Sequence, residues 1–339
     1  MNGRIRLSFL CVPLLVCGGL SGQMLLVDRG LPPGNLNSAA GPARANLRLE
    51  WNREDNQGFV GDVFQVGAPG EVWRIERVRT WAVPDDRNPG AALGDLYSRI
   101  ALYGGLDGGS LAVLKMAELA PGASAPSTPG VTAAPAAYDS GAAYEEFGRS
   151  LPLWQIEFSN LRWTVPGGVP VAFGVMGTGW PVPGGGGANY LWFNHASAAG
   201  ASYRLRMFNA AGAQEAFFDS DGQVWDKSTT INIQAWGRQL AGVIVRRAGK
   251  DFQVALRGGP GFDINRVNAA SLRFGAGRAA PEGRRIDDFD RDGYIDLVLE
   301  FSAAKAGIAP DDAEACLSGA RFDGVPFEGC DAAAVVGKR

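Results

Sequence analysis

An unusual density of carboxylates marks one short stretch near the end of the sequence. The segment "DFDRDGYID", residues 288–296, places aspartates at its first, third, fifth and ninth positions and Gly293 at its sixth. Ca²⁺ takes six to eight oxygen ligands at about 2.3–2.6 Å, and alternate carboxylates of a tight loop supply them. The spacing D-x-D-x-D-G-x-x-D therefore predicts a calcium loop. Its predicted ligands are Asp288, Asp290, Asp292, Asp296 and, through its backbone carbonyl, Tyr294.

The alternative is an acidic, solvated turn that holds no ion. Carboxylates only a few ångströms apart raise one another's pKa values and oppose a compact turn unless a cation lies among them. This repulsion favours the calcium loop over the empty turn. Asp287 alternates with Asp288 and is predicted to point away from the ion.

Residues 288–296 resemble the calcium loops of EF-hands, type I dockerins and the integrin-type repeats of β-propellers. An EF-hand carries Glu at position twelve and helices on both sides, whereas here position twelve is Leu299 and the following "LVLEF" is strand-like. The resemblance is therefore to the strand-flanked kind, in which the aspartate at position nine closes the cage. It implies a structural ion that ties a turn to a strand.

The wider C-terminal region resembles an uncharacterised β-sandwich module of secreted bacterial proteins. The resemblance rests on "FDINRVNAASLRFG", on the aspartate loop with "DLVLEF", and on "LSGARFDGVPFEGCD". Such a module is appended to other extracellular domains, and the resemblance implies no enzymatic activity.

The sequence offers little for catalysis, and we expect a protein that is not an enzyme. His195 is the only histidine, so an HExxH zinc site is excluded, and no G-x-S-x-G elbow accompanies it. A glycosidase needs two facing carboxylates, but the adjacent Glu145 and Glu146 would point opposite ways on a strand. A glycoside hydrolase built on another pair is the remaining enzymatic alternative.

Carbohydrate binding is the main competing function. The candidate sugar-binding aromatics flank the glycine-rich loop "PVPGGGGAN" and are Trp180, Tyr190 and Trp192, of which Trp180 is expected to be exposed. The opposing interpretation is that the aromatic residues belong to the core, where each buries about 150–250 Å². This is the interpretation we favour for the tryptophans within strand-like segments, Trp73, Trp81, Trp154 and Trp163.

The segments that must position these residues have strand character throughout. Short apolar runs with period-two alternation are separated by Gly, Pro, Asn and Asp, which predicts an all-β protein of jelly-roll or Ig-like sandwiches. In "EVWRIERVRTWAV" strict alternation would divide the strand into Trp73, Ile75, Arg77, Arg79 and Trp81 on one face and Val72, Arg74, Glu76, Val78 and Thr80 on the other. Residues 120–143, rich in Ala, Pro, Ser and Gly, are predicted to be a flexible insertion.

The first 22 residues have the order of a secretory signal peptide. Arg4 and Arg6 precede an apolar run that is shorter than the roughly 20 residues needed to span a bilayer, and small residues follow. Cys17 raises the alternative of a lipoprotein, which the branched Val16 before it disfavours. We therefore expect a protein secreted from the cell or released to the periplasm.

Two domains are predicted after the signal peptide. Residues 23–238 would form a jelly-roll-like sandwich and residues 239–339 a smaller sandwich that carries the calcium loop. Cys316 and Cys330 remain as an even pair in an oxidising compartment and are predicted to form a disulfide. The formal charge of −3 does not suggest a nucleic-acid partner, and no transmembrane segment is visible after the signal peptide. A glycan or a cell-surface protein is the expected partner.

Overall fold

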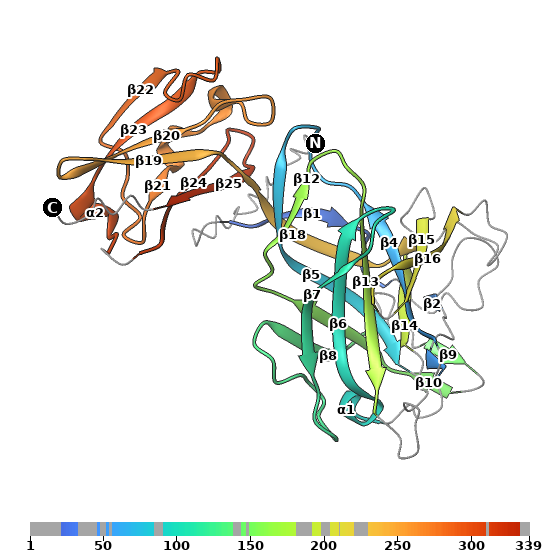
Figure 1. Ribbon diagram of the computed structural model, residues 1–339. Helices are drawn as coiled ribbons and strands as arrows, with labels where there is room; N and C mark the ends of the chain where they lie inside the picture. Colours follow the sequence, from blue (N-terminus) through green and yellow to red (C-terminus); the bar gives the residue numbers. More distant parts are fainter. Residues whose placement is uncertain are drawn as a thin grey trace, which may run out of the picture.

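The computed structural model describes residues 22–32, 46–47, 52–53, 56–84, 91–137, 144–146, 149–180, 192–197, 204–209, 211–219, 230–309 and 312–332. Strands dominate these residues, which confirms the all-β prediction (Figure 1). The helical elements are single turns: α1 (Leu93–Leu96), α2 (Ala303–Ala306), and the 3₁₀ turns Ile264–Arg266 and Ala269–Ser271. Among the described residues, no helix has the length and apolar character to reach across a bilayer.

The largest sheet has twelve strands and runs through most of the molecule. Its main path is β17 (Thr230–Ile231), β14 (Trp192–Ser197), β5 (Val72–Pro84), β18 (Ile233–Leu240), β25 (Pro326–Ala332), β24 (Glu314–Ala320) and β21 (Arg273–Phe274). The strands attached beside this path are β1 (Met24–Asp28), β2 (Asn46–Leu47), β8 (Val131–Ala136), β11 (Leu153–Phe158) and β12 (Trp163–Pro166).

Three further sheets lie within the part of the chain that the structure describes. The seven-stranded sheet contains β16 (Gln214–Asp219), β15 (Arg204–Asn209), β4 (Asn56–Phe64), β13 (Val171–Gly179), β6 (Tyr97–Leu106), β7 (Ala112–Glu118) and β3 (Asn52–Arg53). The four-stranded sheet contains β19 (Val243–Ala248), β20 (Asp251–Leu256), β23 (Asp296–Ser302) and β22 (Gly283–Asp287). The pair β9 (Tyr144–Glu146) and β10 (Arg149–Leu151) forms a two-stranded sheet.

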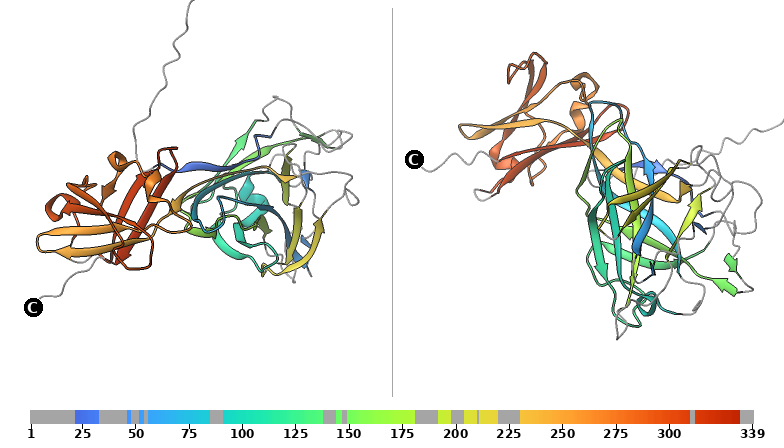
Figure 2. Two further views of the ribbon diagram at one scale, coloured as in Figure 1. Left: turned by 90° about the horizontal axis from the view of Figure 1, so that it is seen from above. Right: turned by 45° about the vertical axis from the view of Figure 1, so that its right-hand side comes forward.

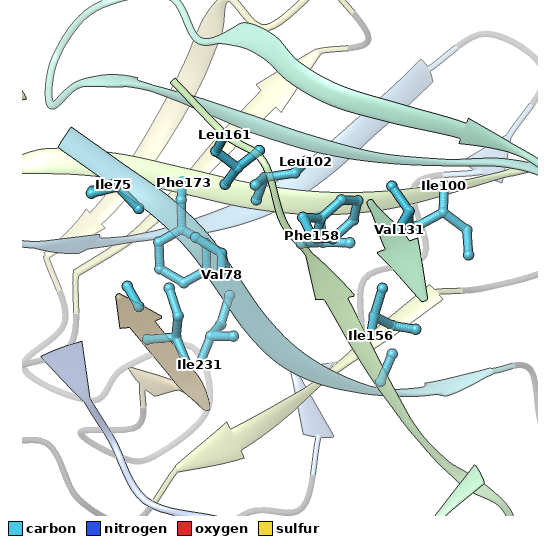
Figure 3. Close-up of a cluster of buried hydrophobic side chains, with 14 of the residues drawn as sticks. Ile75, Val78, Ile100, Leu102, Val131, Ile156, Phe158, Leu161, Phe173 and Ile231 are labelled. Carbon is cyan, nitrogen blue, oxygen red and sulfur yellow. The ribbon is translucent and has the colours of Figure 1, made fainter. Parts of the chain in front are cut away.

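Each of the two lobes that Figures 1 and 2 show contains a large cluster of buried apolar side chains. In the N-terminal lobe, β1 to β18, side chains such as Ile156 on β11 and Phe173 on β13 meet between the twelve-stranded and seven-stranded sheets (Figure 3). In the C-terminal lobe, β19 to β25, the cluster joins the four-stranded sheet to β21, β24 and β25. The domain boundary at residue 238 stays a prediction, since β18 itself pairs with strands of both lobes.

The predicted flexible insertion at 120–143 is wrong for its central part. Residues Val131–Ala136 form β8, which pairs along its whole length with β11. Val131 and Ala133 enter the core on alternate positions, and Figure 3 shows Val131 beside Ile100. Pro135 is tolerated because β8 is an edge strand, where a missing N–H breaks no ladder.

The strict alternation predicted for β5 also fails at one point. Ile75 and Val78 both enter the core, although they are three positions apart (Figure 3). The register of β5 against β18 shifts between Ile75 and Arg77, so Glu76 is the extra residue of a β-bulge. Beyond the bulge, Arg77 and Arg79 lie on the outer face of the sheet instead of the face that carries Ile75.

Four charged side chains connect the lobes where β18 meets β25, and we call them the inter-lobe network: Arg74, Glu76, Arg238 and Glu328. The Nη2 atom of Arg238 lies 2.9 Å from one oxygen of Glu76, and the Nη2 atom of Arg74 lies 2.9 Å from the other. Both arginines also pair with Glu328 from the C-terminal lobe. Two guanidinium groups thus balance two carboxylates in a largely buried position.

Candidate metal centre

The aspartate loop, residues 288–295, connects edge strand β22 to β23. The two strands pair in antiparallel register down to Asp287 opposite Asp296, and β20 covers the other edge of β23. Two residues of the loop adopt left-handed backbone conformations, Arg291 with φ of 65° and Gly293 with φ of 91°. Glycine adopts such angles without steric cost, which explains its place at the sharpest part of the turn.

Three of the predicted ligands come together. One carboxylate oxygen from each of Asp288, Asp290 and Asp296 lies within 4.8 Å of the others. Two oxygens that share one Ca²⁺ at about 2.4 Å are separated by no more than about 4.8 Å, so the three oxygens fit a single ion. Asp288 is exposed, Asp290 is partly buried and Asp296 is fully buried, which leaves the outer side of the cluster open to further ligands.

Asp296 holds the buried end of the loop through two hydrogen bonds. Its Oδ1 accepts a hydrogen bond from the backbone N–H of Gly258, and its Oδ2 accepts one from the N–H of Phe289, both at 2.9 Å. Gly258 follows β20, so this one carboxylate ties the start of β23 to two other segments. The ring of Phe289 in turn packs under the guanidinium of Arg246, 4.3 Å from its centroid. The buried end of the loop is therefore fixed by the protein itself.

Asp288 organises the exposed end of the loop. Its two oxygens accept hydrogen bonds from the backbone N–H groups of Asp292, at 3.1 Å, and Gly293, at 3.2 Å. The N–H of Asp292 also lies 3.2 Å from an oxygen of Asp290. These contacts turn the backbone around the carboxylates and hold them close together at the mouth of the loop.

Asp292 departs from the prediction that it joins the other three carboxylates. Its Oδ1 accepts a hydrogen bond from the N–H of Tyr294, and its Oδ2 accepts one from Nη2 of Arg257, both at 2.9 Å. The backbone N–H of Tyr294 and the Arg257 guanidinium hold the pKa of Asp292 below its usual value. A carboxylate turned toward an arginine is less available to an ion. The role of the Tyr294 carbonyl as a ligand stays a prediction.

Arg257 is the residue of this site that the sequence analysis missed. It lies 31 or more positions before the aspartates, and only the pairing of β20 with β23 brings it alongside them. Its Nε lies 2.6 Å from Oδ2 of Asp290. The carboxylates raise its already high pKa further, Asp292 through its hydrogen bond most of all. Arg257 thus pairs with two of the four aspartates, and because Arg291 lies in the loop as well, the site keeps a net charge of −2.

The predicted disulfide is present between Cys316 and Cys330. The two residues are directly opposite one another in the antiparallel pair β24–β25, and the sulfur atoms are bonded. A crosslink that closes 14 residues of chain contributes on the order of 3 kcal/mol in the loop-entropy model. The hairpin that it closes is also the one that supplies Glu328 to the inter-lobe network.

Of the three predicted sugar-binding aromatics, one, Trp180, has a side chain among the described residues, so the sugar site stays a prediction. Trp180 was expected to be exposed, but it is partly buried because its indole N–H donates to the carbonyl of Gly94 in α1, at 2.7 Å. Tyr190 lies outside the described residues, and so do the side chains of Trp192 and His195, whose backbone is part of β14. The core tryptophans Trp73, Trp81, Trp154 and Trp163 are buried as predicted.

Comparison with known proteins adds no relative. No protein-family model matches the chain, and a search of the curated proteins gives no match. The chemistry of the site therefore rests on its own geometry.

Proposed function

We propose that this protein is an exported, non-catalytic recognition protein whose C-terminal lobe is stabilised by one Ca²⁺ in the aspartate loop. The observation that carries the calcium site is the cluster of carboxylates: one oxygen from each of Asp288, Asp290 and Asp296 lies close enough to the others for one ion. Arg257 pairs with two of the four aspartates, so the cluster stays net negative. Ca²⁺ suits a flexible cage of protein oxygens, whereas Mg²⁺ demands near-ideal octahedral geometry and keeps several of its waters.

The ion would act by tying elements of the lobe together. Asp288 and Asp290 belong to the exposed loop, whereas Asp296 is buried and hydrogen-bonded to Gly258 beyond β20. An ion shared by these carboxylates would connect the exposed edge hairpin β22–β23 to the interior of the sheet. Because no helix flanks the loop, the ion would stabilise the lobe and would not move a helix as in a calcium switch.

Recognition outside the cytoplasm is the role that this proposal assigns to the whole chain. The support is the N-terminal sequence of signal-peptide type together with a disulfide, which persists in oxidising compartments. A glycan or a cell-surface protein is the proposed partner class. Cell fractionation with mass spectrometry of the mature N-terminus tests export: a chain that starts near residue 22 outside the cytoplasm supports it, and an uncleaved cytoplasmic chain contradicts it.

Hydrogen exchange tests the calcium half of the proposal. Saturating Ca²⁺ should slow exchange of the loop amides that hydrogen-bond the carboxylates, those of Asp292, Gly293 and Tyr294, relative to a sample in chelator. Peptides from β6 and β13 in the other lobe serve as the internal control and should not change. Equal exchange in both samples, or protection spread evenly over both lobes, contradicts a calcium site in this loop.

A further inference from the structure

The strand β22 is an edge of the four-stranded sheet in the C-terminal lobe (Figure 1). Within the part of the chain that the structure describes, it pairs with β23 on one side only, and residues 284–287 are all exposed. Alternate backbone N–H and C=O groups of an edge strand point away from the sheet, and a further strand can pair with them. This edge is therefore open to a strand from another molecule.

The opposite edge of the same sheet, β19, is protected against such pairing. The backbone N–H of Val245 in β19 donates to Oδ2 of Asp331 in β25, at 2.8 Å. The charged residues of β19 are Arg246 and Arg247, without a carboxylate, and charges of one sign oppose the pairing of two copies. Strand β22 differs because it carries charges of both signs.

The charges of β22 are complementary to those of a second, antiparallel β22. Arg285 precedes Ile286 and Asp287 follows it, so the strand has a positive charge on one side of an apolar residue and a negative charge on the other. When two copies pair with Ile286 opposite Ile286, each Arg285 lies opposite Asp287 of the other copy. Directly opposite residues share a face of the sheet, where opposite charges stabilise the pairing. Twofold symmetry forms both charge pairs at once.

The three side chains of this register are available for contact. Within one chain Nη2 of Arg285 lies 3.5 Å from Oδ2 of Asp287, and the two side chains are 44% and 51% exposed. An ion pair so exposed contributes little, so little is lost when its members pair across the dimer instead. Ile286 is 62% exposed, and the same residue of a second copy would cover it.

The next pair in this register carries no part of the inference. Arg284 would lie opposite Asp288, which follows the last residue of β22. The carboxylate of Asp288 already accepts hydrogen bonds from backbone N–H groups of its own loop. The argument therefore rests on residues 285–287.

We propose that two copies of this chain form a dimer by antiparallel pairing of β22 with β22, centred on Ile286. The four-stranded sheets of the two copies then form one continuous sheet. A single pair of strands buries less surface than a standard protein interface, so the dimer forms in a concentration-dependent manner. Each dimer carries two N-terminal lobes and so presents any recognition surface of that lobe twice. The inference needs neither the calcium site nor an identified ligand, and it fails or succeeds separately from both.

Sedimentation equilibrium of the purified protein, over a concentration series that extends to the millimolar range, tests the proposal. The samples contain chelator, so that Ca²⁺ shared between two aspartate loops cannot cause association. We expect a monomer–dimer equilibrium for the wild type. Asp287→Arg places an arginine opposite Arg285 in both symmetric pairs and should weaken dimerisation by about tenfold or more. Arg285→Asp should do the same, because it places two carboxylates opposite one another.

Charge exchange then tests the register. A mixture of the Arg285→Asp and Asp287→Arg proteins should form heterodimers, although each variant alone stays largely monomeric, because every opposite pair in the mixture again joins unlike charges. The double variant that carries both changes should dimerise within a few-fold of the wild type for the same reason. A wild type that is monomeric at every concentration overturns the proposal. Failure of both the mixture and the double variant to recover the dimer also overturns it.

A matched pair of variants separates this edge from general association of exposed apolar side chains. Ile286→Lys places two like charges opposite one another at the centre of the interface and should abolish the dimer. Phe322→Lys changes a side chain that is 73% exposed in the turn between β24 and β25, and it should leave dimerisation unchanged. Equal weakening by the two variants overturns the proposal. The changed side chains are exposed, so the variants should melt at the wild-type temperature; if Asp287→Arg does not, Arg285→Asp and Ile286→Lys decide.

Discussion

The inter-lobe network and the aspartate loop are both clusters of carboxylates and arginines, yet they differ in charge balance. In the network two arginines face two glutamates, and Glu76 and Arg238 are each 7% exposed. At the aspartate loop Arg257 pairs with two of the four aspartates, so the cluster stays net negative, and most of the four are reached by solvent. A balanced, buried cluster has no net charge to attract an ion, and it joins two parts of the chain. An unbalanced, open cluster is suited to take up a cation.

The largest effect should come from breaking the balanced cluster. Glu76→Gln leaves Arg238 and Arg74 with half of their negative partners in a buried position, which typically costs about 3–5 kcal/mol. Denaturant unfolding measures the loss. Glu157→Gln is the matched control, because its pair with Arg79 is more exposed and should contribute less than about 1 kcal/mol. Equal losses from the two variants would contradict the comparison.

The next largest effect distinguishes two contributions to stability, that of the Asp296 hydrogen bonds and that of the bound ion. Asp296→Ala removes the acceptor for two backbone N–H groups and should destabilise the protein by about 2–3 kcal/mol even in chelator. Asp290→Ala should change stability in chelator by less than about 1 kcal/mol, because it removes an ion pair with the half-exposed Arg257. Both variants should lose the stabilisation that Ca²⁺ gives. A chelated Asp296→Ala protein as stable as the wild type would show that the anchor is unimportant.

Arg257→Gln tests whether Arg257 competes with Ca²⁺ for the carboxylates of the loop. Removing a positive charge beside the carboxylates should tighten calcium binding several-fold, since like charges at such distances repel by roughly 1 kcal/mol or more near a protein surface. Calcium titration measures the change, and Arg284→Gln on the neighbouring strand β22 is the control. Weaker calcium binding by Arg257→Gln would mean that Arg257 orders the carboxylates and does not compete with the ion.

The smallest effect concerns the proton affinity of Asp292. The N–H of Tyr294 and the guanidinium of Arg257 lower its pKa in the folded protein, so its stabilising contribution is present above the unfolded pKa and is lost as the pH falls through the folded one. Carboxyl chemical shifts in NMR should give a midpoint below 3.8 for Asp292. The midpoint should rise in Arg257→Gln but stay below 3.8, because the Tyr294 N–H remains. A wild-type midpoint at or above 3.8 would contradict the contacts described.

Local spacing predicted the features that depend on neighbouring residues. The alternate aspartates and Gly293 indicated the turn and its carboxylates, and strand periodicity indicated the all-β fold. The sequence did not predict that Asp292 turns to Arg257, because that arginine arrives through strand pairing. It also did not predict the β-bulge at Glu76. This bulge shifts the register of β5 against β18 by one residue and places Arg77 on the outer face of the sheet.

Composition alone gave wrong predictions for segments rich in small residues, because such residues occur in packed strands as well as in flexible loops. The Ala- and Pro-rich stretch around β8 has the composition of a linker, yet Val131 and Ala133 fit the core because β11 offers a complete partner strand. Likewise, a glycine-rich neighbourhood suggested an exposed Trp180, whose indole N–H instead finds the carbonyl of Gly94. Both outcomes depend on contacts between distant parts of the chain.

The most direct test of the central claim is a calorimetric calcium titration of the metal-free protein beside Asp290→Ala. The account predicts saturable binding of one Ca²⁺ to the wild type, a rise in melting temperature with the ion, and loss of both in the variant. No binding heat together with a melting temperature that chelator leaves unchanged would contradict it. The aspartate loop would then be an acidic turn, held by Arg257 and its own backbone N–H groups alone.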